Sequence, residues 1–251
     1  MIHIVGAGPG DPDLITVKGA RYLAEADVII YAGSLVNPAL LNLCKKGAEI
    51  HNSAHMTLDE VVDVIARAES EGKMTVRLHT GDPAIYGAIQ EQMDVWEKRG
   101  FEYDVVPGVS SFLGTAAVLR QEYTLPGISQ TVIITRNEGR TPVPEREKLR
   151  SLAAHHATMC IFLSISMIDE VAAELISGGY EHTTPVAIVQ RATWPEQKIL
   201  RGTLATIAEQ VAAEEIGRTA MIVVGDCLGA EYELSKLYAP GFSHMFRDAK
   251  Q

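Results

Sequence analysis

Short apolar runs alternate with helix-period patterns along the first half of the chain. Runs short enough for buried strands occupy residues 2–5, 28–31, 74–78 and 103–106. Patterns typical of helices, with apolar residues three and four positions apart, occupy residues 17–25, 57–71, 85–98 and 110–117, and another begins near Pro38. Strands that alternate with helices predict a mostly parallel sheet covered on both faces. We therefore expect residues 1–112 to form a doubly wound α/β domain.

The second half predicts a mixed sheet rather than a copy of the first. Its apolar runs occupy residues 131–135, 159–163, 185–190, 198–202 and 220–225, with helical patterns near 168–177 and 204–213. Only a short Thr-Trp-Pro turn separates residues 185–190 from residues 198–202, which is too little chain for a crossover helix. Parallel neighbours need such a crossover, so these two strands should be antiparallel. We expect residues 113–251 to form a second, mixed α/β domain.

A glycine-rich loop follows the first strand, where a doubly wound sheet binds its ligands. Residues 6–12 read Gly-Ala-Gly-Pro-Gly-Asp-Pro. Asp11 stands where a dinucleotide-binding fingerprint has its third glycine, and Pro9 and Asp11 both disfavour a helix N-terminus that binds pyrophosphate. The glycines instead let a ligand approach the backbone closely, and the acceptor groups suit a neutral or cationic ligand. For this loop taken alone, a tight turn without a ligand is the alternative.

Two further loops follow strands of the same predicted sheet. Residues 79–87 read His-Thr-Gly-Asp-Pro-Ala-Ile-Tyr-Gly, and a Pro-Gly pair at residues 107–108 precedes the small-residue segment 110–117. Because the carboxyl ends of parallel strands meet at one edge of a sheet, all three loops should open there. Two Gly-Asp-Pro loops on one edge favour a shared pocket over independent turns.

Composition narrows the possible partners. The chain has 22 Lys and Arg against 32 Asp and Glu, a formal net charge of −10, so its overall field does not attract nucleic acid. Cys44, Cys160 and Cys227 form neither a CxxC pair nor an even disulfide set, and we expect them to be buried. The histidines lack metal-ligand spacing, so no metal site is predicted. Since the pattern contains neither a secretion leader nor a membrane span, we expect a cytoplasmic protein.

Five motifs, taken in order, resemble those of the tetrapyrrole methylases, which use S-adenosylmethionine. They are Gly-Ala-Gly-Pro-Gly-Asp-Pro at residues 6–12, Tyr-Ala-Gly-Ser-Leu-Val at 31–36, Thr-Gly-Asp-Pro-Ala-Ile-Tyr-Gly at 80–87, Pro-Gly-Val-Ser-Ser at 107–111 and Arg-Ala-Thr-Trp-Pro-Glu-Gln at 191–197. The resemblance runs from residue 2 to about residue 247 and so covers nearly the whole chain. It implies two α/β domains with an active-site cleft between them, a homodimer, and S-adenosylmethionine-dependent methyl transfer to a tetrapyrrole.

The same motifs imply contacts to the cofactor in both domains. By motif matching, the S-adenosylmethionine contacts are Pro9, Thr80, Gly81, Asp82, Ile85, Ser110, Ser111, Leu163 and Ala192. Leu163 and Ala192 stand where relatives place a methionine and a glycine. No acid or base is assigned, because the uroporphyrinogen-III methylases have an aspartate after the second-strand tyrosine and residues 32–34 contain no carboxylate here. His79 is a candidate base or a structural residue.

Contacts to the substrate can be suggested from its chemistry. Tetrapyrrole precursors of this kind carry many carboxylates, which arginine binds in bidentate fashion. Arg136 and Arg191 each lie at the end of a predicted strand and are the main candidates, with Arg120 and Arg140 as further ones. Tyr86 has two readings, stacking on adenine or tetrapyrrole and packing under its own loop. On a chain of net charge −10, binding a polycarboxylate requires that arginines gather locally.

Two alternatives stay open at this point. A methylase of the same fold could act on another tetrapyrrole or on a non-tetrapyrrole substrate, and a non-catalytic carrier could keep the pocket without turnover. An RNA-modifying enzyme should have a basic face with interleaved aromatic residues, which an acidic chain with 6% aromatic residues does not indicate.

Overall fold

The computed structural model describes three stretches of the chain, residues 1–33, 35–229 and 231–248. Ser34, in the motif at residues 31–36, therefore lies outside the described residues. Across these three stretches, no helix has both the length and the apolar character needed to cross a membrane.

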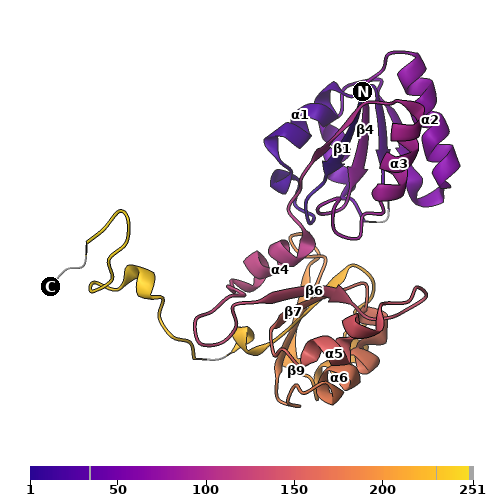
Figure 1. The fold of residues 1–251 in the computed structure, drawn as a ribbon. Coiled ribbons are helices and arrows are strands. Elements are labelled where there is room, and N and C mark those ends of the chain that lie inside the picture. Colours follow the sequence, from indigo (N-terminus) through magenta and orange to yellow (C-terminus); the bar gives the residue numbers. More distant parts are fainter. Residues whose placement is uncertain (34, 230, 249–251) are drawn as a thin grey trace. The chain divides into compact units, whose positions relative to one another are not determined.

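The chain forms two compact units (Figure 1). Unit 1 consists of residues 1–118 and 191–197, and unit 2 consists of residues 119–190 and 198–251. Each unit contains one five-stranded sheet. The domain boundary predicted between residues 112 and 113 falls inside helix α4 (Ser111–Leu119) and stays a prediction.

Unit 1 contains a parallel sheet. Its strands are β1 (Ile2–Gly6), β2 (Val28–Tyr31), β3 (Glu49–Asn52), β4 (Thr75–His79) and β5 (Tyr103–Val106). They lie in the order β3-β2-β4-β1-β5, and every neighbouring pair is parallel. Figure 1 shows α1 (Val17–Glu25) on one side of this sheet, with α2 (Leu58–Ser70) and α3 (Gln90–Arg99) on the other. The prediction of a parallel, doubly wound sheet is confirmed.

Alternation along the strands sends apolar side chains to both faces of this sheet. Ile2 and Ile4 of β1 join the cluster that contains Trp96 of α3, whereas Val5 joins the cluster that contains Leu23 of α1. These five side chains are completely buried. Burying one aliphatic side chain of this size contributes about 1.5–3 kcal/mol relative to leaving it exposed. Two such layers explain why the unit 1 strands read as continuous apolar runs rather than as alternating ones.

Three details of unit 1 differ from the sequence prediction. Strand β3 was not predicted, because its Glu-Ile-His-Asn sequence contains no apolar run. The helix expected from Pro38 is a 3₁₀-helix over Pro38–Leu43. The helix expected over residues 85–98 begins only where α3 does, because Tyr86 and Ala88 have φ angles of 56° and 49°, which lie outside the helical region.

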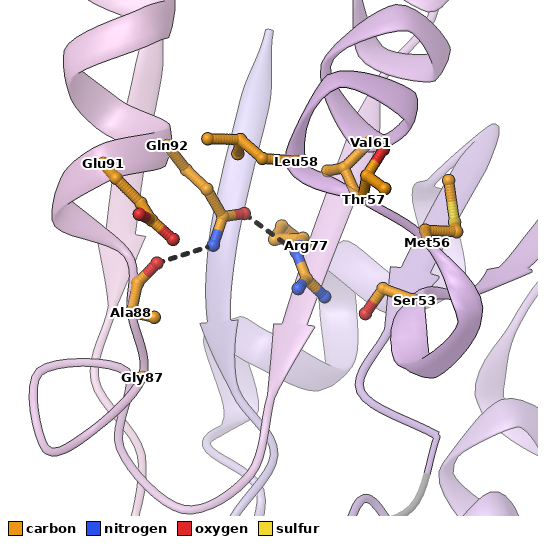
Figure 2. A pocket seen from close by; sticks show the side chains of 10 residues that line it. All are labelled: Ser53, Met56, Thr57, Leu58, Val61, Arg77, Gly87, Ala88, Glu91 and Gln92. Carbon is orange, nitrogen blue, oxygen red and sulfur yellow. Dashed lines mark hydrogen bonds between the residues drawn. The ribbon is translucent and has the colours of Figure 1, made fainter. Parts of the chain in front are cut away.

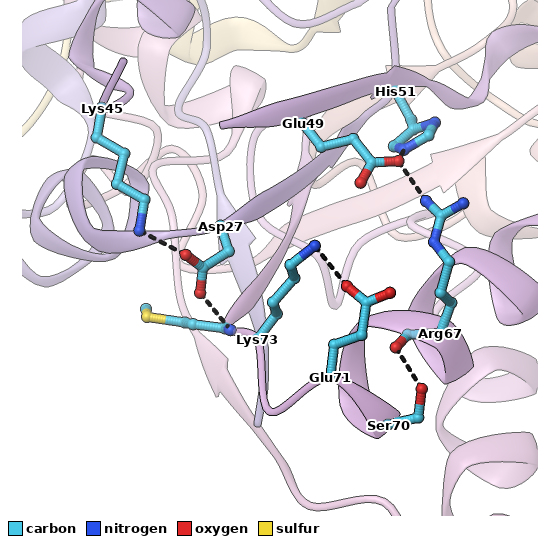
Figure 3. A network of polar contacts seen from close by, with 9 residues as sticks. Asp27, Lys45, Glu49, His51, Arg67, Ser70, Glu71 and Lys73 are labelled. Carbon is cyan, nitrogen blue, oxygen red and sulfur yellow. Dashed lines mark hydrogen bonds and ion pairs between the residues drawn. The ribbon is translucent and has the colours of Figure 1, made fainter. Parts of the chain in front are cut away.

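Polar contacts hold the starts of three strands in line (Figure 3). Glu49, the first residue of β3, forms an ion pair with Arg67 of α2. Asp27, just before β2, forms a 2.6 Å ion pair with Lys45 and accepts a 2.9 Å hydrogen bond from the N–H of Met74, just before β4. Two hydrogen bonds lower the pKa of the Asp27 carboxyl: the larger effect comes from Lys45 and the smaller from the N–H of Met74. Because exposed ion pairs add little stability, the contacts serve mainly to align β2, β3 and β4.

Unit 2 contains the predicted mixed sheet. Its strands are β6 (Val132–Arg136), β7 (Thr158–Phe162), β8 (Pro185–Gln190), β9 (Lys198–Thr203) and β10 (Ala220–Val224), in the order β6-β7-β10-β8-β9. Strands β6 and β7 are parallel, β10 is antiparallel to both β7 and β8, and β8 is antiparallel to β9. The expected antiparallel pairing of β8 with β9 is thus confirmed. Strands β6, β7 and β8 run in one direction, so their carboxyl ends lie at one edge.

Helices pack against the unit 2 sheet around a separate core. They are α5 (Leu149–Ala153), α6 (Ile168–Ser177) and α7 (Ile207–Ala213). Its core joins strand and helix side chains that include Met159, Ile161, Val171, Leu175, Ile188, Ile207 and Ile222. Helix α5 was not predicted, because one and a half turns are too short to display a periodic pattern. The helix expected over residues 204–213 starts later, because the Thr206 hydroxyl accepts a 3.0 Å hydrogen bond from the Thr203 N–H and turns the chain first.

Candidate functional site

Two loops run side by side at the carboxyl edge of the unit 1 sheet. The first loop (residues 6–12) follows β1, and the second loop (residues 79–87) follows its neighbour β4. The N–H of Ala7 donates to the carbonyl of His79 at 2.7 Å. Gly8 and Gly81 then exchange hydrogen bonds of 2.9 and 3.3 Å. Beyond the parallel strands, the two loops are therefore joined by an antiparallel bridge and share one backbone framework.

A third loop (residues 107–111) packs onto this framework through glycine. A Cβ added at Gly108 would lie 2.2 Å from the carbonyl oxygen of Gly81 and 2.8 Å from the Cα of Gly6. Real Cβ atoms do not approach backbone so closely, so only glycine permits this contact. The three loops predicted to open at one edge therefore touch one another there.

Asp82 of the second loop ties these segments together. One carboxylate oxygen accepts a 2.9 Å hydrogen bond from the N–H of Gly108, and the other accepts a 2.8 Å hydrogen bond from the N–H of Ala84. Both oxygens are thus engaged by backbone donors of unit 1. Hydrogen bonds to a charged acceptor each contribute about 1.5–3 kcal/mol. Asp82 therefore stabilises its own loop and connects it to the third loop.

The start of α4 adjoins the second loop. A Cβ placed on Gly81 would lie 3.5 Å from the Cα of Ser110 and 3.5 Å from the N of Ser111. Ser110 is buried and Ser111 is partly buried. Ile85 is also partly buried, and its N–H donates to the carbonyl of Asp82 at 3.2 Å. The structure thus brings together Gly81, Asp82, Ile85, Ser110 and Ser111, and their contact with the cofactor stays a prediction.

The segment at residues 191–197, between β8 and β9, packs on the first loop. The indole Nε1–H of Trp194 donates to the carbonyl of Pro9 at 3.1 Å. The hydroxyl of Thr193 accepts a 2.9 Å hydrogen bond from the N–H of Asp11. Sequence reasoning did not identify Trp194 and Thr193 as partners of this loop. The Thr-Trp-Pro turn was visible, but nothing in its spacing said where the indole would lie.

Close packing around Gly10 shows how tight this contact is. A Cβ on Gly10 would lie 2.0 Å from Cδ1 of Trp194 and 2.9 Å from the carbonyl oxygen of Ala192. The carbonyl of Gly10 also accepts a 2.8 Å hydrogen bond from the side-chain amide of Asn37. Pro9 and Ala192, two of the implied cofactor contacts, are thus held next to one glycine. Beside them, Asp11, Asn37, Thr193, Trp194 and other residues of unit 1 line a cavity of about 520 Å³.

Buried polar atoms at the end of β4 and in helix α4 lack partners among the described residues. They are Nε2 of His79 and the hydroxyls of Thr80 and Thr115. Burial, together with the charge of nearby Arg77, lowers the pKa of His79 to about 3. His79 is therefore neutral at neutral pH. Buried polar groups without hydrogen bonds are unfavourable, so this end of β4 suits a ligand that offers them partners.

Tyr86 lies in the second loop on strained backbone. Its φ angle of 56° is uncommon for a residue with a Cβ, and 46% of its surface is exposed. The ring is therefore not buried beneath its own loop, one of the two readings left open by the sequence. Contact of Tyr86 with a ligand stays a prediction.

Leu163 follows β7 in unit 2. It combines a φ angle of 55° with 65% exposure of an aliphatic side chain. Left-handed backbone is unfavourable for leucine and concentrates at functional positions. Contact of Leu163 with the cofactor, which the resemblance implied, stays a prediction.

The four candidate arginines differ in what their side chains already do. Arg136 uses its guanidinium to donate to three carbonyls of the following loop, those of Asn137, Thr141 and Pro142. Arg191 is exposed, and its guanidinium carbon lies 5.8 Å from the centroid of the Trp194 ring. The carbonyl of Arg191 accepts a 3.0 Å hydrogen bond from the N–H of Trp194, but its guanidinium makes no hydrogen bond or ion pair within the described stretches. The two further candidates, Arg120 and Arg140, are both exposed. The described residues contain no group of three His, Cys, Asp or Glu side chains that could hold a metal ion.

Comparison with known proteins gives consistent matches along the chain. A family model described as Tetrapyrrole (Corrin/Porphyrin) Methylases matches residues 1–208. The chain is 59% identical to a cobalt-precorrin-4 C(11)-methyltransferase of Methanocaldococcus jannaschii, over 98% of this chain and 95% of that protein. It is 44% identical to a precorrin-4 C(11)-methyltransferase of Pseudomonas aeruginosa, over 98% of both chains.

Solved structures of similar methyltransferases also match this chain. An X-ray structure of a cobalt precorrin-4 methyltransferase matches with a TM-score of 0.89 and 48% identity, covering 91% of this chain and 96% of that one. Uroporphyrin-III C-methyl transferase from Thermus thermophilus, complexed with S-adenyl homocysteine, matches with a TM-score of 0.76 and 26% identity, covering 91% and 93%. The fold, the ordered motifs and these matches agree. The chain belongs to the tetrapyrrole methylase family.

Proposed function

We propose that this protein transfers a methyl group from S-adenosylmethionine to C11 of precorrin-4, as the free ligand or its cobalt complex, in cobalamin biosynthesis. The observation that carries the proposal is 59% identity over 98% of the chain to a protein named for that reaction. Identity of 47% to the corresponding Priestia megaterium protein, over a similar span, adds support. Since both names specify cobalt, the cobalt complex is the first substrate to assay.

The loops of unit 1 fit the proposed cofactor. The hydroxyl of Thr80 and Nε2 of His79 are buried polar atoms without partners among the described residues. The space over Gly6, Gly10 and Gly108 is filled by other protein atoms, so these glycines fix the loops rather than admit a ligand to the backbone. Pro9, Gly81, Ser110, Ser111 and the other implied contacts would hold the cofactor. When bound, S-adenosylmethionine supplies an electrophilic methyl group on a sulfonium.

The chain's own contribution to the reaction is alignment. Displacement at a methyl carbon needs nucleophile and leaving group in line, and holding reactants aligned can lower a barrier by about 7–11 kcal/mol. Asp82 and Gly108 fix the second and third loops, and Trp194 fixes the first loop at Pro9. His79 is neutral and buried, so it adds no charge beside a cationic cofactor. The proposed mechanism therefore uses a rigid wall rather than a strong acid or base.

Arg191 is the better of the two main candidates for binding a substrate carboxylate. Its guanidinium is exposed and makes no hydrogen bond within the described stretches, whereas that of Arg136 is occupied by three carbonyls. We expect Arg191→Ala to raise KM for the tetrapyrrole while leaving the Kd of S-adenosylhomocysteine unchanged. Steady-state kinetics and calorimetry measure the two quantities. An equal effect on both would overturn the assignment.

A homodimer in the cytoplasm completes the proposal. The resemblance implies the dimer, and the C-terminal segment of unit 2 exposes large apolar side chains, including Leu234, Tyr238, Met245 and Phe246 at 79–86%. Exposed apolar groups on this scale favour a covering partner. The three cysteines are free, which suits a reducing compartment. Sedimentation of the full chain, compared with a chain that ends before residue 232, tests the dimer: the full chain should sediment as a dimer and the shortened one as a monomer.

The decisive experiment locates the transferred methyl group. The protein is incubated with S-adenosylmethionine labelled with ¹³C in the methyl group and with cobalt-precorrin-4 or precorrin-4. Mass spectrometry should detect one added methyl group, and ¹³C NMR should place it at C11. A methyl group on another carbon would overturn the regiochemistry. Cofactor binding without transfer to either substrate would instead favour a non-catalytic carrier.

A further inference from the structure

A smaller cavity of unit 1 is lined by residues other than those assigned so far (Figure 2). Its volume is about 190 Å³, several times the roughly 30 Å³ that one water occupies in the liquid. The start of α2, the start of α3 and the middle of β4 contribute to its lining, which includes Ser53, Thr57, Arg77, Ala88, Glu91 and Gln92. None of these residues belongs to the implied cofactor or substrate contacts. The cavity therefore calls for its own explanation.

Arg77 of β4 is the one cation in this lining. Only 7% of its surface is exposed. Its Nε donates to the Gln92 side-chain oxygen at 3.0 Å, and its Nη1 donates to the carbonyl of Ile30 at 3.2 Å. Gln92 is itself held by a 2.9 Å hydrogen bond to the carbonyl of Ala88 (Figure 2). The guanidinium is thus rigidly placed by two neutral acceptors, while Nη2 makes no hydrogen bond to the described residues.

The positive charge of Arg77 has no carboxylate partner in the described stretches. Burial lowers its pKa to about 10, so the group stays protonated at neutral pH. A buried charge without a counter-charge is strongly unfavourable, and proteins normally pair such groups. Glu91 is the only acidic residue in the lining, yet it is exposed and lies beyond ion-pair distance of Arg77. An anion in the cavity would balance the charge.

The cavity's position favours a ligand that enters from the carboxyl edge of the sheet. Ser53 directly follows β3, and Gly87 and Ala88 belong to the connection that follows β4. Thr57 caps the N-terminus of the 13-residue helix α2, where the Glu60 carboxylate already accepts hydrogen bonds from the N–H and the hydroxyl of Thr57. The hydroxyl of Ser53 already donates to the carbonyl of Tyr31 at 3.1 Å, which leaves Arg77 as the principal donor.

We propose that this cavity binds the carboxylate group of a small molecule, with Arg77 as its cationic partner. The Nη2 group, which makes no hydrogen bond to the described residues, can donate a charge-assisted hydrogen bond to a carboxylate oxygen. One source of the carboxylate is a side chain of the tetrapyrrole, and this assignment rests on the proposed function. The other source is a free short-chain carboxylate that occupies the cavity independently of the reaction.

Titration with sodium propionate tests the cavity without any enzymatic assay. Thermal unfolding and the ¹H–¹⁵N signal of the Arg77 Nε–H are followed at constant ionic strength, with the neutral isostere propionamide as the control. We expect propionate, but not propionamide, to raise the Tm and shift the signal in a saturable way. Arg77→Met should abolish the rise in Tm, and Arg67→Gln, which removes an exposed arginine, should leave it intact. An equal response to propionamide, or an intact response in Arg77→Met, would overturn the proposal.

Glu91→Gln tests carboxylate binding in the cavity even if Arg77→Met does not fold. Removing the one carboxylate in the lining should tighten propionate binding by about threefold, the scale of an interaction between partly exposed charges. If Glu91 instead supplied the counter-charge of Arg77, Glu91→Gln would lower the Tm and leave propionate affinity no tighter. That result would overturn the proposal.

The source of the carboxylate is decided by kinetics of Arg77→Lys, which keeps the charge but loses the planar fork. If the tetrapyrrole supplies the group, KM for cobalt-precorrin-4 should rise about tenfold while the Kd of S-adenosylhomocysteine stays constant. An unchanged KM, together with propionate binding by the wild type, identifies a free carboxylate. Absence of both effects overturns the site. Absence of methyl transfer by the wild type would refute the proposed function alone, because the propionate titration does not depend on it.

Discussion

The loops at the carboxyl edges of the two sheets are held in different ways. In unit 1 every strand is parallel, so three loops meet at one edge and hold one another through backbone hydrogen bonds and glycine contacts. In unit 2 only β6, β7 and β8 run in one direction, and the segments after β6 and β7 are joined by one 2.8 Å hydrogen bond from the N–H of Asn137 to the hydroxyl of Ser164. Arg136 is occupied by its own loop, and Leu163 is exposed on strained backbone. A parallel edge thus makes a rigid wall, whereas the mixed edge contributes individual side chains.

Gly108→Ala should have the largest effect, because Gly108 lies where the three loops of unit 1 (residues 6–12, 79–87 and 107–111) pack against one another. These packed loops are called the wall of unit 1. The new Cβ would lie 2.2 Å from the Gly81 carbonyl oxygen, and backbone cannot rotate away as a side chain does. Overpacking of this kind costs typically 1–3 kcal/mol, and we expect about 3 kcal/mol here, measured by urea denaturation. Gly217→Ala in unit 2 is the matched control, since the nearest atom to its Cβ would be 3.9 Å away. Wild-type stability of Gly108→Ala would refute the rigid-wall description.

Acidification should also weaken unit 1 selectively. The pKa of His79 is lowered to about 3 by burial and by the charge of Arg77. In the unfolded chain it returns to about 6.5, so below that pH the unfolded state binds a proton that the folded state does not. Folding stability is therefore lost as the pH falls, by about 2 kcal/mol at pH 5 relative to neutral pH.

His79→Gln measures this contribution. Between pH 7 and pH 5, urea denaturation should find that the variant loses about 2 kcal/mol less stability than the wild type. Unit 2 offers a contrast, because burial raises the pKa of Cys160 to about 12 and that of Tyr180 as well, so both stay neutral over this range. Equal acid sensitivity of wild type and variant would show that His79 is not buried as described.

Trp194→Phe should have a smaller effect, confined to the first loop. The ring is kept, but the 3.1 Å hydrogen bond from the indole to the Pro9 carbonyl is lost. A hydrogen bond of this type contributes about 1 kcal/mol, so binding of S-adenosylhomocysteine should weaken about fivefold by calorimetry. Trp96→Phe is the control, because its buried indole N–H has no partner within the described stretches. Equal weakening in both variants would mean that Trp194 does not position the loop.

The sequence predicted the elements whose apolar runs end at clear turn residues. Val28–Tyr31, Tyr103–Val106 and Ile168–Ser177 have the expected bounds because each has an apolar face that must be buried. Strand β3 was missed because an edge strand held by ion pairs carries no apolar signal. Tyr86 and Ala88 interrupted an expected helix through backbone angles that residue type does not reveal.

From the sequence, only those features of the site that follow from the direction of the strands could be predicted. Parallel strands require that the loops at residues 6–12 and 79–87 be neighbours, and they are. The contact of Trp194 with Pro9 spans 185 positions, and no local pattern encodes it. Arg77 escaped notice because it sits inside a strand that reads as a buried run, whereas strand-end arginines were sought. Contacts between distant segments, and charges hidden inside elements, need the three-dimensional structure.

Leu163→Gly should have the smallest effect and makes the sharpest test of the mixed edge. Left-handed backbone costs a leucine about 1–2 kcal/mol, and glycine adds about 0.5–1 kcal/mol of unfolded-state entropy, so stability should rise by about 0.5 kcal/mol. Because the side chain is 65% exposed, little burial is lost. Glu215→Gly, at a φ of 50°, should give the same gain. If Leu163 contacts the cofactor, only Leu163→Gly should also weaken S-adenosylhomocysteine binding, about threefold for one exposed aliphatic contact. Unchanged affinity would leave the strain at Leu163 without a role in binding, and the working surface would then lie in the wall of unit 1.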